Sequence, residues 1–393
     1  MTIGDTVRQA VTLLRRGMST LFARARGTVA PGRSEPLSSE RFRAVFEAAM
    51  AGLPQAALAD HQLLHLPANR PPWLDTGMVL SPGDAVSWFA NGRVVLSSAL
   101  DIFVEPHFQL WARVGGRDVF RSTRDTYTFV AERAGRLELA SYFPGQWATR
   151  DGELETPESA YESVTGGIDV ALVRWTGDPT LGLVALAQND ATGLAGRELE
   201  RQAIVSSTPP GWSHLWFLGP SEIYERIDSD DGPCIRCRTH CDVGILRRRI
   251  DAPLTAHTTL RWSWKVDSLP SVLAEDTLPT HDYLSIAVEY DNGIDVTYYW
   301  SASLPPGFGY WCPLPTWKDR EFHVVVRSGA ASLGAWLGEE RNLYEDYRRY
   351  VGAPPTRISR VWFIANSLFQ RRPGSCAYRG ISIGCGEDRT TVL

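Results

Sequence analysis

Residues 260–266, which read Leu-Arg-Trp-Ser-Trp-Lys-Val, alternate between apolar and polar side chains without a break. Successive side chains of a strand point to opposite faces, so this period predicts a β-strand with Trp262 and Trp264 turned inward and Lys265 turned outward. Similar short segments, separated by Gly, Pro, Asn and Asp, recur from about residue 64 onward. They are 85–91, 93–97, 108–114, 126–131, 136–143, 169–175, 284–290, 296–300, 322–326, 361–365 and 379–383.

Segments of this length and spacing predict a mostly β chain, built as two antiparallel β-sandwich (jelly-roll-like) domains with an N-terminal helical segment. A chain of 393 residues is too long for one ordinary sandwich. We expect four parts along the chain: a helical segment at 1–60, a first sandwich at 61–177, a connector at 178–211 and a second sandwich at 212–393.

Helical spacing is confined to a few segments. Residues 4–26 form a basic amphipathic pattern with an apolar stripe. Such a helix either docks on its own domain or serves membrane-surface binding or self-association, and both alternatives stay open. Further helices are expected at about 39–53, 194–204 and 339–351.

Charge and composition exclude some classes of protein. The net charge of -5 argues against a dedicated nucleic-acid binder, which would carry a basic stripe. No run of about 18 apolar residues predicts a transmembrane helix. Arg15 and Arg16 interrupt the only apolar stretch near the N-terminus, so no signal peptide is expected. We therefore expect a cytoplasmic protein, with a membrane-peripheral role through residues 4–26 as an alternative.

Residues 234–241, Cys-Ile-Arg-Cys-Arg-Thr-His-Cys, look like a zinc knuckle. On a strand, however, Cys237 and Cys241 lie about 13 Å apart, and His240 points to the opposite side. Tetrahedral zinc needs every ligand within about 2.0–2.3 Å of the ion. The pattern favours buried thiols over a metal site, so no metal and no cofactor are expected. The other three cysteines are scattered and predict no pairing: Cys312, Cys376 and Cys385.

The polar sides of the C-terminal strands form a second candidate site. Strand alternation turns eight charged or titratable side chains away from the apolar faces of their own strands: Arg236, Arg238, His240, Arg261, Lys265, Glu289, His323 and Arg327. They are either solvated surface or a binding face, because antiparallel sheets commonly expose one side to water. The acid/base candidates in this region are Glu289, His323, His240 and Asp282.

The stretch 259–383 resembles the bacterial family of domain of unknown function 3047. The matching features are Leu260–Val266, His281-Asp282-Tyr283 before a Val-rich strand, Tyr299-Trp300, Val324–Gly329, Trp336, Glu340-Arg341-Asn342, Tyr344, Asp346-Tyr347 and Gly352. The family pattern tends to have Asp where His281 stands. This resemblance implies a fold more than an activity.

The opening of the first sandwich is similar to the galactose-binding jelly roll of galactophilic bacterial lectins. The likeness rests on residues 72–80, Pro82-Gly83-Asp84-Ala85-Val86 and Ala90-Asn91-Gly92. In those lectins the calcium- and sugar-binding loop is rich in Asn and Asp, whereas residues 142–167 stand in its place here. The resemblance therefore implies a shared scaffold without a carried-over calcium site.

The leading hypothesis is recognition of a glycan or glycoconjugate by a two-sandwich protein. Aromatic side chains would stack on sugar rings while charged ones bind hydroxyls, at Trp147, Trp300, Trp311, Trp336, Tyr298, Lys265, Arg341 and Asp346. The alternative is a cofactor-free enzyme, a hydrolase, lyase, isomerase or cyclase, that acts on a small hydrophobic or glycosylated metabolite. The expected partner is a carbohydrate or small molecule, and a structural or membrane-peripheral adaptor is a third hypothesis.

Overall fold

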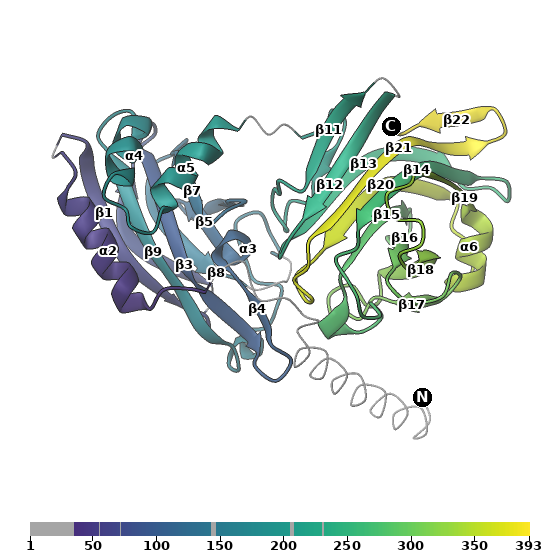
Figure 1. The fold of residues 1–393 in the computed structure, drawn as a ribbon, viewed down its shortest axis with the longest axis horizontal. Helices are drawn as coiled ribbons and strands as arrows, with labels where there is room; N and C mark the ends of the chain where they lie inside the picture. Colours follow the sequence, from purple (N-terminus) through teal and green to yellow (C-terminus); the bar gives the residue numbers. More distant parts are fainter. Residues whose placement is uncertain (1–34, 55, 71, 143–146, 205–207, 230–231) are drawn as a thin grey trace. The chain divides into compact units, whose positions relative to one another are not determined.

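The computed structural model describes residues 35–54, 56–70, 72–142, 147–204, 208–229 and 232–393. The helix expected at 4–26 lies outside these residues. The described chain forms two compact units (Figure 1). The N-terminal unit comprises Ser34–Ser206 and Phe217–Pro220, and the C-terminal unit comprises Ser207–Trp216 and Ser221–Leu393. Among the described residues, no helix is long and apolar enough to cross a membrane.

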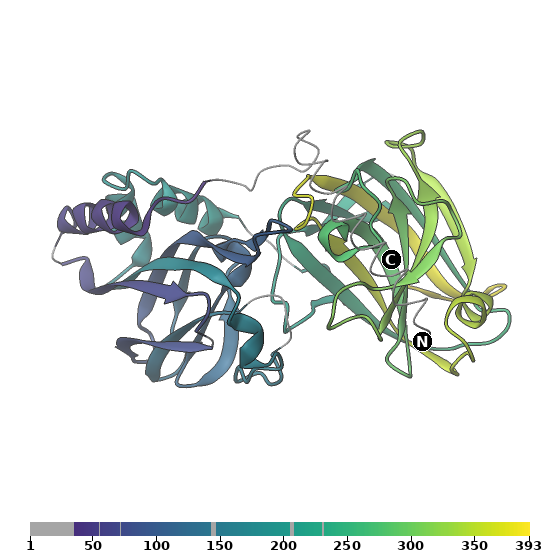
Figure 2. The same cartoon turned by 90° about the horizontal axis from the view of Figure 1, so that it is seen from below.

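The N-terminal unit contains two sheets, seen turned by 90° in Figure 2. The first has the order β1-β9-β3-β4, with β7 also paired to β3, and the second has the order β2-β8-β5-β6. The strands are β1 (Leu58–Pro67), β2 (Trp73–Leu80), β3 (Ala85–Ser97), β4 (Ile102–Val104), β5 (Leu110–Val114), β6 (Arg117–Arg121), β7 (Thr126–Val130), β8 (Gly135–Ser141) and β9 (Thr165–Trp175).

Helices pack on one face of the five-stranded sheet. They are α2 (Ser39–Ala51), α4 (Pro179–Ala187) and α5 (Leu194–Ala203), while the short α3 (Pro106–Gln109) and η1 (Glu158–Tyr161) lie between strands. Ser38 caps α2 by accepting a hydrogen bond from the backbone N–H of Arg41. The apolar stripe of α2 packs Phe42 and Phe46 against Phe89 of the sheet, which confirms the second predicted helix.

The C-terminal unit is a sandwich of a seven-stranded sheet, β10-β13-β20-β15-β16-β18-β17, and a six-stranded sheet, β11-β12-β21-β14-β19 with β22 beside β21. Within the larger sheet β16 and β18 run parallel, and their neighbours pair antiparallel. The strands are β10 (Ser213–His214), β11 (Tyr224–Ser229), β12 (Gly232–Thr239), β13 (Val243–Pro253), β14 (Thr259–Ser268), β15 (Tyr283–Tyr290), β16 (Asp295–Ser301), β17 (Gly309–Trp311), β18 (Glu321–Ser328), β19 (Leu337–Asn342), β20 (Arg357–Asn366), β21 (Gly374–Cys385) and β22 (Asp388–Thr391).

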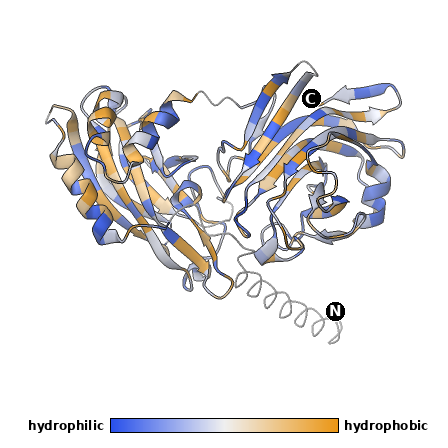
Figure 3. Ribbon diagram, viewed as in Figure 1, coloured by the Kyte–Doolittle hydropathy of each residue, from blue (hydrophilic) through white to orange (hydrophobic). Residues whose placement is uncertain are grey.

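The core of this unit lies between the two sheets. Trp262 and Trp264 are 2% and 0% exposed and belong to one cluster of buried residues with Tyr298, Trp300 and Phe363. Figure 3 shows hydrophilic and hydrophobic residues following one another along these strands. The inward-facing tryptophans are therefore confirmed, and with them the mostly β, sandwich-type fold.

The predicted helix at 339–351 is wrong over residues 339–342. Residues up to Asn342 form β19, which pairs with β14, and only Leu343–Tyr350 form the helix α6. Asn342 ends the strand and caps the helix by accepting a hydrogen bond from the backbone N–H of Glu345. The pairing with β14 is a contact between distant residues, and it outweighed the local helical spacing.

Candidate functional site

The outer face of the six-stranded sheet, turned away from the core, carries a group of cations. In the strand register Arg236 of β12 and Lys265 of β14 both lie opposite Ala377 of β21, and Arg379 stands two residues further along β21. Side chains at such positions share one face of a sheet. Arg261 precedes Lys265 by four residues on β14, so it lies on this face as well.

An aromatic side chain lies beside these cations. The guanidinium carbon of Arg379 is 4.1 Å from the ring centroid of Trp336, which is a cation–π contact. The three cations also lie close enough to the thiol of Cys234 to affect its pKa. Burial raises the pKa of this thiol, while the positive charges of Arg236, Arg379 and Lys265 lower it. We call Trp336, Arg379, Lys265 and Arg236 the cationic face.

Carboxylates balance part of the charge on this sheet. Arg236 pairs with Glu225 of β11, and Lys265 lies 3.6 Å from Asp267. Arg261 is on the same side of the sheet but pairs with Glu340 at 3.0 Å, and it is not one of the four residues of the cationic face. These side chains are half-buried or exposed, and exposed ion pairs gain little energy because water screens them. The ion pairs of Arg236 and Lys265 on the cationic face are therefore weak contacts that water reaches.

The outer face of the seven-stranded sheet is different, because it is buried. Asp295, Thr297, Glu321 and His323 point away from the core and are at most 3% exposed. Two segments lie over them, residues 269–282 and 302–320, which we call the first and second covering segments. Tyr310 lies on β17, the edge strand within the second segment, directly opposite His323 of β18, and its ring stacks on His323 with centroids 5.0 Å apart.

Glu275 fastens the first covering segment to the sheet. Its fully buried carboxylate accepts hydrogen bonds from Ser301 Oγ at 2.6 Å, from the backbone N–H of Ala302 at 2.7 Å and from Ser271 Oγ at 2.6 Å. Burial raises the pKa of this carboxyl, and the hydrogen bonds oppose that effect. The backbone carbonyl of Glu275 in turn accepts a hydrogen bond from Nδ1 of His281 at 2.7 Å.

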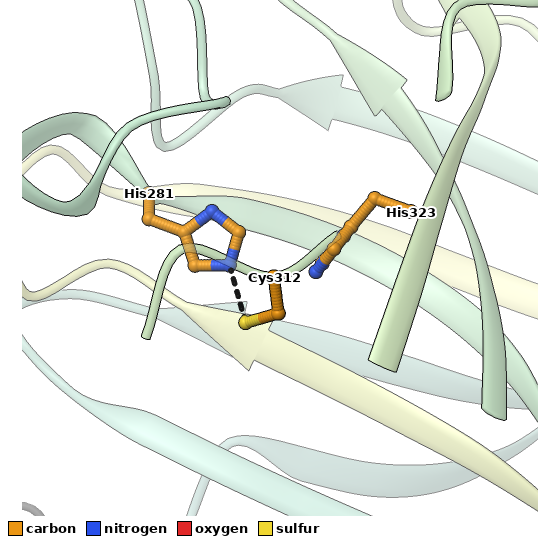
Figure 4. Close-up of side chains that lie close together, drawn as sticks. All are labelled: His281, Cys312 and His323. Atoms are coloured by element: carbon orange, nitrogen blue, oxygen red, sulfur yellow. Dashed lines mark hydrogen bonds between the residues drawn. The ribbon is translucent and has the colours of Figure 1, made fainter. Parts of the chain in front are cut away.

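His281, Cys312 and His323 come together between the covering segments and the sheet (Figure 4). Nε2 of His281 lies 3.4 Å from Sγ of Cys312, and one ligand atom from each of the three residues lies within 4.8 Å of the others. Burial lowers the pKa of His281 to about 3, so its ring is neutral. Burial, followed by the charge of Glu321, raises the pKa of the Cys312 thiol. Among the described residues this is the group with metal-ligand spacing.

Glu321 supplies negative charge next to this group. Its Oε1 accepts hydrogen bonds from Tyr283 Oη at 3.1 Å and Thr297 Oγ1 at 2.9 Å, and it lies 3.3 Å from Nε2 of His323. Burial opposes ionisation of Glu321, but the neighbouring His323 outweighs it and lowers the pKa of the carboxyl. The charge of Glu321, after burial, raises the pKa of Asp295 on the adjacent strand.

The four predicted acid/base residues do not form one site. Glu289 accepts hydrogen bonds from Arg360 and Trp362 at 2.6 and 2.9 Å, and His240 is exposed after the end of β12. Asp282 is fully buried and accepts backbone N–H groups of the 369–370 turn at 3.0 and 2.6 Å. Burial raises its pKa to about 7. Only His323 takes part in the group with Cys312.

The predicted ligand-binding residues are also divided. Trp147 and Trp300 are buried, Trp311 is 40% exposed, and Trp336 is half-buried on the cationic face with Lys265. Three others form a hydrogen-bonded network in which Asp346 accepts from Tyr298 at 2.9 Å and from Arg341 at 2.8 Å. That network anchors α6 to the core.

Sequence reasoning missed His281, Cys312, Glu321 and Glu275. His281 was visible as a departure from the family pattern, but nothing local joined it to Cys312, 31 residues away. The cysteines of residues 234–241 are buried thiols, and they form no ligand group among the described residues. Of the eight polar side chains predicted to point away from the apolar faces of their own strands, seven are divided between the two sheets, and His240 follows the end of β12.

The N-terminal unit has one small cleft that the structure describes well. Its lining includes Ser39 and Arg43 of α2 together with His65 and Asp169 of neighbouring strands. Nδ1 of His65 lies 2.7 Å from a carboxylate oxygen of Asp169. This pair belongs to no group with metal-ligand spacing among the described residues.

Comparison with family models matches residues 210–382 to the family described as protein of unknown function (DUF3047). The match confirms the resemblance drawn from residues 259–383 and covers most of the C-terminal unit. No curated protein matches the chain.

Solved structures with some similarity include sugar-binding and sugar-degrading proteins. The EclA N-terminal domain, a PllA-like lectin, is 15% identical over 31% of this chain and 99% of its own, with a TM-score of 0.24. A family 11 carbohydrate-binding module of a Clostridium thermocellum cellulase is 10% identical over 45% of this chain and 84% of its own, with a TM-score of 0.22. The xyloglucanase domain of NopAA from Sinorhizobium fredii is 10% identical over 46% and 100%, with a TM-score of 0.26.

Proposed function

We propose that the C-terminal unit recognises acidic glycans, those that carry carboxylate or sulfate groups, on the cationic face of its six-stranded sheet. One observation carries the proposal: Trp336, Arg379, Lys265 and Arg236 are grouped on one solvent-facing side of a sheet. Sugar rings pack on aromatic faces, and arginine binds carboxylates and sulfates through its planar fork of donors.

The arrangement supports an extended ligand more than a small one. Strands stand about 4.8 Å apart, so side chains on β12, β21 and β14 cover about 10 Å across the sheet. The cations lie on an open sheet face and are backed by buried core residues. A charged polysaccharide chain can contact several of them at once, and affinity then accumulates from contacts that are weak singly.

An acid/base enzyme without a cofactor is not supported by a comparable observation. Glu289, His240 and Asp282 are each held by separate partners or lie apart, as described above. Recognition is therefore the function that the described residues support best.

The test is binding of the full chain to immobilised polysaccharides at low and moderate salt. Polygalacturonate, hyaluronan and chondroitin sulfate are the acidic probes, and galactan and dextran are the neutral ones. We expect binding to at least one acidic polymer and a loss of about tenfold in affinity when salt is raised, because exposed charges are screened. Tighter binding to a DNA duplex than to every polysaccharide would contradict the proposal.

Variants locate the binding surface. Trp336→Ala and the double change Lys265→Ala with Arg379→Ala should each weaken binding to the acidic polymer about tenfold or more. Arg348→Ala is the matched control, since Arg348 is an exposed cation of α6 that pairs with Glu345 outside the cationic face. Retained affinity in both cationic-face variants would place the binding elsewhere.

A further inference from the structure

We infer that His281, Cys312 and His323 bind one structural zinc ion, which joins both covering segments to the seven-stranded sheet. His281 lies at the end of the first covering segment, Cys312 lies in the second, and His323 belongs to β18. The proposal concerns the buried side of the unit and is independent of glycan binding. It revises the expectation, drawn from the sequence, that the chain holds no metal.

His281 is held in the form that a metal requires. Its Nδ1 lies 2.7 Å from the backbone carbonyl of Glu275, and a carbonyl only accepts, so Nδ1 carries the proton. Nε2 is then unprotonated and presents its lone pair to Cys312. Metal-binding histidines usually donate their second ring N–H to a carbonyl or carboxylate in this way.

The spacing of the three side chains is close to that of a zinc site. With Zn–S of about 2.3 Å and Zn–N of about 2.0–2.1 Å, tetrahedral geometry puts ligand atoms roughly 3.5 Å apart. Nε2 of His281 and Sγ of Cys312 already lie 3.4 Å apart. The ligand atoms of all three residues lie within 4.8 Å, so the longest separation must shorten by about 1 Å on binding.

His323 provides an independent observation. It is fully buried, yet neither ring nitrogen makes a hydrogen bond with the described residues. Nε2 has one close polar neighbour, Glu321 Oε1 at 3.3 Å, whereas Nδ1 has none among the described residues. Buried polar groups are nearly always paired, because leaving one unpaired destabilises the fold. Figure 4 shows a ring nitrogen of His323 directed toward Cys312 and His281.

The charges balance when a divalent ion is bound. Zinc binding forms a bond to Sγ of Cys312, and the thiol proton leaves to solvent. The resulting thiolate and the carboxylate of Glu321 together carry two negative charges, which neutralise Zn²⁺ in a region without water-exposed atoms. Two imidazoles and a thiolate are typical zinc ligands, and soft sulfur disfavours magnesium and calcium.

The closed surroundings indicate a structural ion, with the Glu321 carboxylate beside His323 and Cys312 as its fourth ligand. His281, Cys312 and His323 are at most 1% exposed, whereas catalytic zinc keeps one position open to water or substrate. Tyr310 and Tyr283 flank His323, with centroids 5.0 and 4.8 Å from its ring. An ion at this place would connect three segments separated by 11 to 31 residues, and its binding energy would stabilise the folded unit.

The experiment is to produce the full chain in cobalt-supplemented minimal medium, because a buried site exchanges metal slowly. Cobalt content is measured by mass spectrometry, and the near-ultraviolet charge-transfer band reports a thiolate–cobalt bond. We expect about one cobalt per chain together with this band. Cys312→Ser should abolish the band, and His323→Gln should weaken binding by at least about 100-fold.

Cys376→Ala is the matched control, since Cys376 is an equally buried thiol on the six-stranded sheet. This variant should keep both the metal and the band. Chains without metal, or a band that persists in Cys312→Ser, would overturn the proposal. If the ligand variants do not fold, the wild-type chain decides: its midpoint of thermal unfolding should fall by several degrees after refolding with chelator, and an unchanged midpoint would refute the structural ion.

Discussion

The two outer faces of the C-terminal sandwich carry similar residues in opposite environments. On the six-stranded sheet Arg236, Lys265 and Arg379 face water. On the seven-stranded sheet Glu321 and His323 are sealed beneath the covering segments. The same alternation of apolar and polar residues produces both faces. What differs is the cover, and the cover decides whether a charge is a solvated surface group or part of a buried network.

The difference has an energetic consequence that mutation can measure. Exposed pairs are screened by water and contribute little, while a buried charge depends on every partner it has. Substitutions on the buried outer face should therefore cost several times more stability than substitutions on the exposed one.

The largest effect is expected at Glu321. Glu321→Ala removes the acceptor of the Tyr283 and Thr297 hydroxyls and the charge beside His323. Loss of one member of a buried network leaves the others unpaired, so the free energy of unfolding should fall by about 3–5 kcal/mol. Urea denaturation followed by tryptophan fluorescence measures it. A loss below about 1 kcal/mol would show that water reaches this face.

A pH dependence of stability is expected from Asp282, whose pKa burial raises from 3.8 to about 7. The folded state then binds the proton more tightly than the unfolded state. The stabilisation is complete below about pH 4 and is lost as the pH rises through 7, on the order of 4 kcal/mol. Burial also raises the pKa of Glu275 and acts in the same direction.

Denaturation curves between pH 4 and 8 check this, with Asp282→Asn as the comparison. The variant keeps one carbonyl oxygen, enough to accept from only one of the two backbone N–H groups of residues 369 and 370, and it cannot ionise. Its stability should vary less with pH than that of the wild type. Equal slopes would mean that Asp282 is ionised throughout.

An intermediate effect is expected at Glu275. Glu275→Gln keeps the size of the side chain but places an amide where the carboxylate accepts from Ser271, Ser301 and Ala302. One buried donor then faces another, so the unfolding free energy should fall by about 1–3 kcal/mol. Protease nicking within residues 269–282 should increase, because Glu275 fastens this segment. Unchanged stability and unchanged cleavage would contradict the anchoring role.

The sequence predicted the strands well and the environments poorly, for a physical reason. Trp262 and Trp264 follow a period of two, and this period depends only on neighbouring residues in the chain. Burial of His323 depends on residues 269–282 and 302–320, which contain many turns and loops and have no periodic pattern. Cys312 follows β17 and His281 precedes β15, and the two side chains meet because both strands belong to one sheet. The order of strands in a sheet cannot be predicted from the spacing of neighbouring residues.

The same limit explains the fate of the predicted site residues. Lys265 and Trp336 reached one face because β14 pairs with β19. The alternation of β14 was readable in the sequence, whereas residues 339–342 of β19 were predicted as helix. Trp147 and Trp300 were predicted to bind sugar because they are aromatic, but both are buried in the core. Aromatic residues are as useful for packing as for binding, so composition alone cannot separate the two roles.

The smallest effect is expected for the pair of Arg236 and Glu225 on the exposed side. Single alanine variants and the double variant form a cycle that isolates the coupling between them. Because both side chains reach water, the coupling should be below about 1 kcal/mol and should decrease further in high salt. A coupling as large as the loss at Glu321 would mean that this face is also covered. The cationic face would then be closed to a polysaccharide, and the contrast between the two sheets would disappear.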